Sequence, residues 1–204
     1  MNRECLIVFT RYPEPGKTKT RLIPVLGAEG AATLQRQMTE QTLAQVKELQ
    51  SERLVSATIC FAGGNQQLMQ NWLGTSFDYQ PQGDGDLGRR MAIAFETALE
   101  AGTQSVVIIG SDCPDLNAQL MMQAFQALEQ HDLVLGPARD GGYYLIGLRR
   151  LIPELFTGIS WSTTEVLQQT MNIAQKLELA VASLPLLSDV DRPEDLPLWK
   201  QGNR

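Results

Sequence analysis

The segment SVVIIGSDCPDL, residues 105–116, constrains the fold of this chain more than any other stretch. Its apolar run from Val106 to Gly110 has no polar alternation, which is typical of a strand buried on both faces of a parallel sheet. Asp112 and Asp115 follow this run directly. In open α/β sheets, ligands bind at the carboxyl ends of the strands. The segment therefore predicts a site at that edge, with Asp112 as a ligand of a divalent metal.

Other patterns along the chain complete the predicted sheet. Apolar runs predict strands at residues 5–10, 54–61, 77–80 and 179–186, and helical periodicity predicts helices at 27–49, 66–73, 87–101, 117–129 and 161–177. The runs 132–137 and 142–148 flank an Asp-Gly turn, which is typical of an antiparallel hairpin. We expect one Rossmann-like domain over residues 1–204, an α/β/α sandwich around a mixed, mostly parallel sheet.

Composition excludes several functional classes. The net charge of −6 argues against binding to nucleic acid or to acidic membranes, because both require a basic face. Cys5, Cys60 and Cys113 lack the spacing of a zinc site and are interpreted as free thiols in a reducing compartment. The apolar run at residues 6–9 is too short for a signal peptide, and no stretch approaches membrane-spanning length. We expect a cytoplasmic protein.

A basic loop follows the first predicted strand, at the same edge of the sheet as Asp112. In this acidic chain, the loop carries four cations, Arg11, Lys17, Lys19 and Arg21, against one acid, Glu14. We interpret it as a phosphate or diphosphate site, in which the cations act together with backbone N–H groups that Gly16 leaves accessible. A basic loop that only faces solvent is the alternative.

A glycine-rich segment, QGDGDLG, precedes the helix expected at residues 87–101. Gly83, Gly85 and Gly88 match G-x-G-x-x-G, but a dinucleotide site would have this motif after the first strand of its unit. We therefore interpret the segment as a flexible loop whose bare backbone approaches a nucleotide closely. Asp86 is equally well explained as a helix cap or as a ligand-binding residue.

The predicted metal site has competing explanations at each position. Asp115 is also explained as the N-cap of the helix that follows it. In the tail SDVDRPEDL, Asp189 or Asp191 is placed to complete the metal shell, although solvated turn chemistry explains both. Magnesium or manganese suits carboxylate and phosphate oxygens and would neutralise a diphosphate leaving group.

The turn between residues 137 and 143 supplies the candidate catalytic base. Asp140 is placed to accept a proton from an attacking hydroxyl, and Gly141, Gly142 and Tyr143 lie beside it in the sequence. Turn chemistry alone explains Asp-Gly equally well. His131, the one histidine, is expected to be exposed, which argues against a histidine-based triad.

Five ordered motifs, covering nearly the whole chain, resemble a known family. FTRYPEPGKTKTRL, QGDGDLGRRM, GSDCPDL, GPARDGGYYLIGL and LLSDVDRPEDL resemble bacterial glycosyltransferase-like proteins labelled selenodomain-associated transferase or arsenosugar biosynthesis glycosyltransferase. The resemblance implies the nucleotide-diphospho-sugar transferase (GT-A) fold. That fold also serves nucleotidyltransferases that make molybdenum-cofactor dinucleotides and lactyl-guanosine diphosphate.

The resemblance also implies roles for single residues. Arg11, Lys17 and Arg21 match the nucleotide phosphate grip, Asp112 with Asp115 matches the metal-binding aspartate motif, and Asp191 matches a second carboxylate on the metal side. Arg139 and Arg192 depart from the family pattern, in which an acidic residue and a threonine are common at those positions.

These observations predict a transferase that uses a nucleotide-diphosphate sugar, Mg²⁺ or Mn²⁺, and a small-molecule acceptor. In this hypothesis the basic loop and the Gly83–Gly88 loop hold the nucleotide, Asp112 and Asp191 hold the metal, and the acceptor binds near Asp140 and Tyr143. A nucleotidyltransferase acting on a nucleoside triphosphate is the enzymatic alternative. A non-catalytic nucleotide-binding module is the third hypothesis.

Overall fold

The computed structural model describes residues 3–202 and contains a mixed seven-stranded sheet. The strands are β1 (Glu4–Arg11), β2 (Ser56–Ala62), β3 (Asp78–Pro81), β4 (Ser105–Gly110), β5 (Leu133–Pro137), β6 (Tyr143–Leu148) and β7 (Val181–Ser183). Their order is β3-β2-β1-β4-β6-β5-β7, and β6 runs antiparallel to both of its neighbours while the other pairs are parallel. This confirms the predicted mixed, mostly parallel sheet and the hairpin around Asp140.

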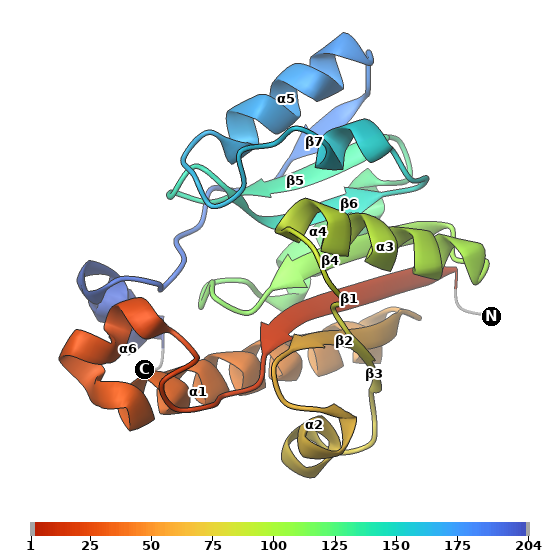
Figure 1. Cartoon of the computed structure of the whole chain (residues 1–204). Coiled ribbons are helices and arrows are strands. Elements are labelled where there is room, and N and C mark those ends of the chain that lie inside the picture. Colours follow the sequence, from red (N-terminus) through yellow and green to blue (C-terminus); the bar gives the residue numbers. More distant parts are fainter. Residues whose placement is uncertain (1–2, 203–204) are drawn as a thin grey trace.

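Helices cover both faces of the sheet (Figure 1). They are α1 (Ile23–Glu52), α2 (Gln66–Leu73), α3 (Leu87–Glu100), α4 (Ala118–Ala127), α5 (Val166–Lys176) and α6 (Leu196–Gly202), with short 3₁₀ turns at η1 (Thr20–Leu22), η2 (Pro153–Phe156) and η3 (Pro193–Asp195). Leu6 and Val8 of β1 pack into the core with α1, α2 and α4, whereas Cys5 and Ile7 pack with α3, η2 and α5. Alternate side chains of a buried strand thus build two separate apolar layers.

Several predicted element boundaries differ from the structure, and two of them lie in the C-terminal part of the chain. The helix expected from Trp161 begins only at Val166, because Ser162 adopts a positive φ of 64° that an α-helix does not allow. The strand expected over residues 179–186 is confined to Val181–Ser183. Pro185 follows this strand closely and has no N–H to extend the ladder.

The C-terminal tail crosses the carboxyl edge of the sheet. Leu187 forms an isolated bridge with Ala138 at the end of β5, and the Val190 N–H donates to the Asp112 carbonyl at 2.8 Å. Val190 is fully buried in a small cluster that also contains Leu34 and Met38 of α1. The tail therefore brings residues 187–191 beside the segment that follows β4. No helix within residues 3–202 is both long and apolar enough to cross a membrane.

Candidate functional site

Two adjoining pockets occupy the carboxyl edge of the sheet. The smaller, of about 240 Å³, lies over the ends of β1, β2 and β3, and the larger, of about 960 Å³, lies over the ends of β4 and β5, the hairpin turn and the tail. Asp112, Asp191 and Leu87 line both pockets. The structure therefore places Asp112 and Asp191 at the junction of two chambers, each large enough to hold part of a ligand.

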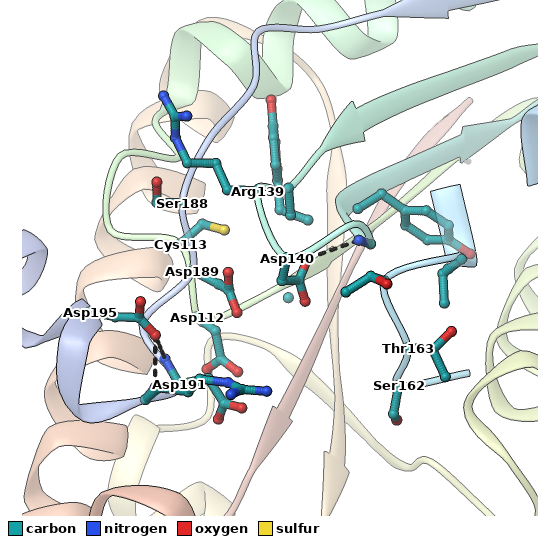
Figure 2. Close-up of a pocket in the computed structure, with 18 of the residues that line it drawn as sticks. Asp112, Cys113, Arg139, Asp140, Ser162, Thr163, Ser188, Asp189, Asp191 and Asp195 are labelled. Carbon is teal, nitrogen blue, oxygen red and sulfur yellow. Dashed lines mark hydrogen bonds between the residues drawn. The ribbon is translucent and has the colours of Figure 1, made fainter. Parts of the chain in front are cut away.

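The larger pocket, called here the wide pocket, is rich in acids. Six carboxylates line it, from Asp112, Asp140, Asp189, Asp191, Glu194 and Asp195, against three arginines, Arg21, Arg139 and Arg192. Figure 2 shows the carboxylates of Asp140 and Asp189 facing one another, with Asp112 beside them. Burial, and then the charge of Asp140, raise the pKa of Asp189 to about 6. Burial first, and the neighbouring negative charge second, thus make the ionised form of this carboxyl group less favourable than it is in water.

The donor chemistry of this pocket fits a hard divalent cation. Among residues 3–202, no three or more His, Cys, Asp and Glu side chains are already spaced as a metal cluster. The excess of carboxylates would repel an anionic ligand, however, and Mg²⁺ commonly binds through one or two carboxylates while phosphate oxygens complete its shell. Asp112, Asp189 and Asp191 are the side chains available for that role.

Lys19 and Arg21 of the basic loop pair with two of these aspartates, Asp112 and Asp191. The Lys19 ammonium, with its side chain 2% exposed, lies 2.9 Å from Asp112 Oδ1 and 4.0 Å from Asp191 Oδ1, and it donates to the Val190 carbonyl at 2.7 Å. Arg21 donates to Asp191 Oδ2. These two cations therefore connect the N-terminal loop, the segment after β4 and the C-terminal tail.

The other predicted members of the loop have different surroundings. Lys17 is 69% exposed, pairs with Glu14 at 2.7 Å and lines neither pocket. Gly16 adopts a positive φ of 80° in the turn beside it, and a Cβ added there would meet no atom within 4 Å. Arg11 lines the smaller pocket, and no carboxylate within residues 3–202 lies in salt-bridge distance of its guanidinium. Arg11 is thus the loop cation most available to an anion.

The glycine-rich segment lies mainly outside the two pockets. Gly83 and Gly85 are exposed and adopt positive φ, and Asp86 caps α3 by accepting from the Arg89 N–H at 2.8 Å. Gly88 is buried, and a Cβ there would come within 2.5 Å of the Trp161 ring. Close packing against Trp161 explains why residue 88 is a glycine, and capping of α3 explains why residue 86 is an aspartate.

The hairpin turn forms one wall of the wide pocket. Asp140 accepts from the Gly142 N–H at 2.8 Å, and a Cβ on Gly141 would meet the Thr164 carbonyl at 2.2 Å. The Tyr143 ring lines the pocket, whereas its hydroxyl is buried, and burial raises the pKa of that hydroxyl. The structure brings Asp140 to the pocket and turns the Tyr143 hydroxyl away from solvent.

Asp115 lies apart from the other predicted metal ligands. It is exposed and lines neither pocket. It is not the helix cap either, since Asn117 caps α4 by accepting from the Leu120 N–H at 3.0 Å. The N-cap interpretation of Asp115 was therefore wrong.

Several residues of the wide pocket were not predicted as site residues. Arg139 and Arg192 line it, as does the segment Trp161–Thr164 in front of α5. The hydroxyl-rich sequence WSTT, mistaken for the start of a helix, was the available signal for this wall. For Arg139 and Arg192, the available signal was their position next to the predicted site residues Asp140 and Asp191 in the sequence.

The comparison with known families decides where the chain belongs. Residues 42–163 match the family described as "Uncharacterized protein conserved in bacteria (DUF2064)". The chain belongs to this family. The chain is also similar to a structure from Desulfovibrio desulfuricans G20 that is provisionally named a nucleotide-diphospho-sugar transferase. It is 36% identical, with a TM-score of 0.92 over 100% of this chain and 89% of that one.

Two further relatives extend the comparison. A 3-phospho-D-glycerate guanylyltransferase from Phenylobacterium zucineum (strain HLK1) is 36% identical over 100 residues, which span 48% of this chain and 45% of that protein. The 4-diphosphocytidyl-2C-methyl-D-erythritol synthase of Anaerococcus prevotii DSM 20548 is 11% identical, with a TM-score of 0.62 over 97% of this chain and 96% of that one. The last likeness concerns the fold alone. Together the comparisons confirm the expected nucleotide-diphospho-sugar transferase-like fold.

Proposed function

We propose that this DUF2064 member is a metal-dependent nucleotidyltransferase that joins a nucleotidyl group from a nucleoside triphosphate to a small phosphorylated acceptor. The observation that carries the proposal is the meeting of two pockets at Asp112 and Asp191. A two-substrate transfer requires one chamber for each substrate and a shared point where the reacting phosphates meet.

The smaller pocket suits the nucleotide. Arg11 supplies a cation without a carboxylate partner in the described part of the chain, and the side chains of Gln35 and Gln82 line the same pocket. The triphosphate would then extend toward Asp112, where both pockets open. Ligand binding at the carboxyl ends of strands is the general rule for open α/β sheets.

The wide pocket suits an anionic acceptor once a divalent cation offsets its excess of carboxylates. Arg139 and Arg192 line it, and within residues 3–202 neither forms a salt bridge with a carboxylate. Free guanidinium groups recognise phosphate and carboxylate through paired N–H donors. The guanylyltransferase relative acts on a phosphorylated carboxylic acid according to its name, so GTP and such an acid are the first substrates to test.

In the proposed reaction, an oxygen of the acceptor phosphate attacks the α-phosphorus of the triphosphate. A new P–O bond forms, the bond from the α-phosphorus to the bridging oxygen breaks, and pyrophosphate leaves with both bonding electrons. A phosphate monoester is already ionised at neutral pH, so this attack needs no general base. Mg²⁺ or Mn²⁺ held by one or two of the carboxylates of Asp112, Asp189 and Asp191, together with phosphate oxygens, would neutralise the negative charge that develops on the leaving pyrophosphate.

The test is pyrophosphate release from purified protein with Mg²⁺, each of the four nucleoside triphosphates and a panel of phosphorylated acids. We expect release only when one triphosphate and an acceptor are both present. Replacing Arg139 by alanine should raise the acceptor KM and leave the nucleotide KM unchanged. Arg149→Ala is the matched control, since Arg149 is an exposed arginine outside both pockets. Absence of pyrophosphate with every triphosphate would refute nucleotidyl transfer.

Glycosyl transfer is the second candidate. It is favoured by the name of the 36% identical relative that aligns over the whole chain. In that reaction an acceptor hydroxyl would attack the anomeric carbon, Asp140 would accept its proton, and a nucleoside diphosphate would leave. The same assay with nucleotide sugars distinguishes the two, because the leaving groups differ.

A further inference from the structure

Lys19 is a buried cation of the loop to which the proposed chemistry gives no role. We propose that its ammonium is an internal counter-ion that keeps free divalent cations away from Asp112 and Asp191, so that metal enters the site only together with nucleotide. The inference rests on the metal-dependent function proposed above and adds to it a role for Lys19 and an order of binding.

The protein engages two of the three N–H donors of the ammonium and surrounds its charge. Of its three N–H donors, one faces Asp112 Oδ1 at 2.9 Å, one faces the Val190 carbonyl at 2.7 Å, and Asp191 Oδ1 lies 4.0 Å away. Its side chain is 2% exposed. Lys19 therefore has little capacity left for a phosphate, in contrast to Arg11.

The backbone holds this ammonium in place. Lys19 adopts a left-handed conformation with φ of 48°, and its carbonyl accepts from the Leu22 N–H at 2.9 Å. The preceding Thr18 is buried, and its hydroxyl donates to the Tyr12 carbonyl at 3.0 Å. A buried charge that lost its partners would be strongly unfavourable, so the ammonium and its carboxylate stay together.

This arrangement disfavours a bare dication. An ion that approaches Asp112 or Asp191 meets a fixed positive charge beside the carboxylates that should attract it. The guanidinium of Arg21, which donates to Asp191, places a second positive charge beside that carboxylate. A triphosphate reverses the balance, because its own negative charges offset both cations and supply further oxygen ligands.

The test is binding of Mn²⁺, followed by electron paramagnetic resonance, with and without each nucleoside triphosphate. In the wild type we expect weak binding of free Mn²⁺ and clear binding once a triphosphate is present. Lys19→Met should bind free Mn²⁺ about tenfold more tightly, since a single and a double charge a few ångströms apart repel by at least that factor even at the dielectric constant of water. A merely structural role for Lys19 predicts the opposite, a loss of Mn²⁺ binding.

Two further variants make the result unambiguous. Lys176→Met removes an exposed lysine that lines neither pocket and should bind Mn²⁺ like the wild type. Lys19→Gln removes the charge but keeps an amide donor for the Val190 carbonyl, and it replaces Lys19→Met if that variant does not fold. Equal or weaker binding of free Mn²⁺ by the folded neutral variant would overturn the counter-ion role alone. Failure of the wild type to bind Mn²⁺ with any triphosphate would overturn the proposed function as well.

Discussion

Replacing Asp112 by asparagine tests the junction of the two pockets most directly. The change keeps the size of the side chain and an oxygen that can accept from Lys19, but it removes the negative charge. The Lys19–Asp112 contact joins a buried ammonium to a carboxylate that is 45% exposed. A hydrogen bond between charged groups contributes about 1.5–3 kcal/mol, and solvent screening of a half-exposed carboxylate reduces this, so we expect a loss of about 1–2 kcal/mol. For a chain of this size that corresponds to a fall in Tm of about 2–8 °C.

Activity should fall much further than stability in this variant. Loss of a charged group that acts on the transition state lowers kcat by about 10²–10³-fold, and we expect a loss of that size in pyrophosphate release. Asp115→Asn is the matched control, because Asp115 follows the same strand but is exposed and lines neither pocket. It should retain wild-type Tm and activity. Equal effects of the two substitutions, or full activity of Asp112→Asn, would refute the placement of the reacting phosphates at Asp112.

Three further predictions concern the walls of the wide pocket. Gly88→Ala should lower Tm in a melting experiment although alanine favours a helix by about 1 kcal/mol, since its Cβ would come within 2.5 Å of Trp161 and overpacking costs about 1–3 kcal/mol; an unchanged or higher Tm would contradict the packing role. Gly141→Ala should lower the free energy of unfolding further than Gly88→Ala does, because φ is +89° and the new Cβ would meet Thr164 O at 2.2 Å. Calorimetry that found no loss of stability would count against this close contact. The raised pKa of Asp189, about 6, means that the folded protein binds this proton more tightly than the unfolded chain does, so the group costs stability as pH rises from about 4 to 6. Asp189→Asn should therefore raise Tm above pH 6 and leave it unchanged near pH 4. An equal shift in Tm at both pH values would show that the effect does not come from ionisation of Asp189.

The sheet was predictable because its strands carry their own signals. The uninterrupted apolar runs of β1 and β4 predict strands that are buried on both faces, and the structure has these two strands side by side and parallel in the middle of the mixed sheet. The Asp-Gly turn likewise predicted the β5–β6 hairpin. Strand ends then predicted that Asp112 lies at the carboxyl edge of the sheet, where the structure has both pockets.

The partners of the charged residues were not predictable in the same way. Arg21 and Asp191 are 170 positions apart in the sequence, and only the path of the tail across the sheet brings them together. The basic loop was therefore interpreted as a set of free cations, whereas Lys19 and Arg21 are paired with aspartates. Gly88 shows the same limitation, because a G-x-G-x-x-G pattern does not reveal that Trp161 packs against its third glycine.

Because the tail forms part of the site, the site can be completed only after the C-terminal residues have been synthesised. Residues 187–191 supply Asp189 and Asp191 and the carbonyl that holds Lys19, yet they are synthesised long after β1, β4 and the basic loop. A nascent chain that has completed β5 and β6 contains the sheet core without the carboxylates that finish the pocket. The contacts of Lys19 with the Val190 carbonyl and of Arg21 with Asp191 can form only after the tail has been synthesised. The positive charges of Lys19 and Arg21 can then attract the tail to its place. Formation of the ion pairs between these cations and Asp191 would thereby be the last step of folding as well as the step that completes the site.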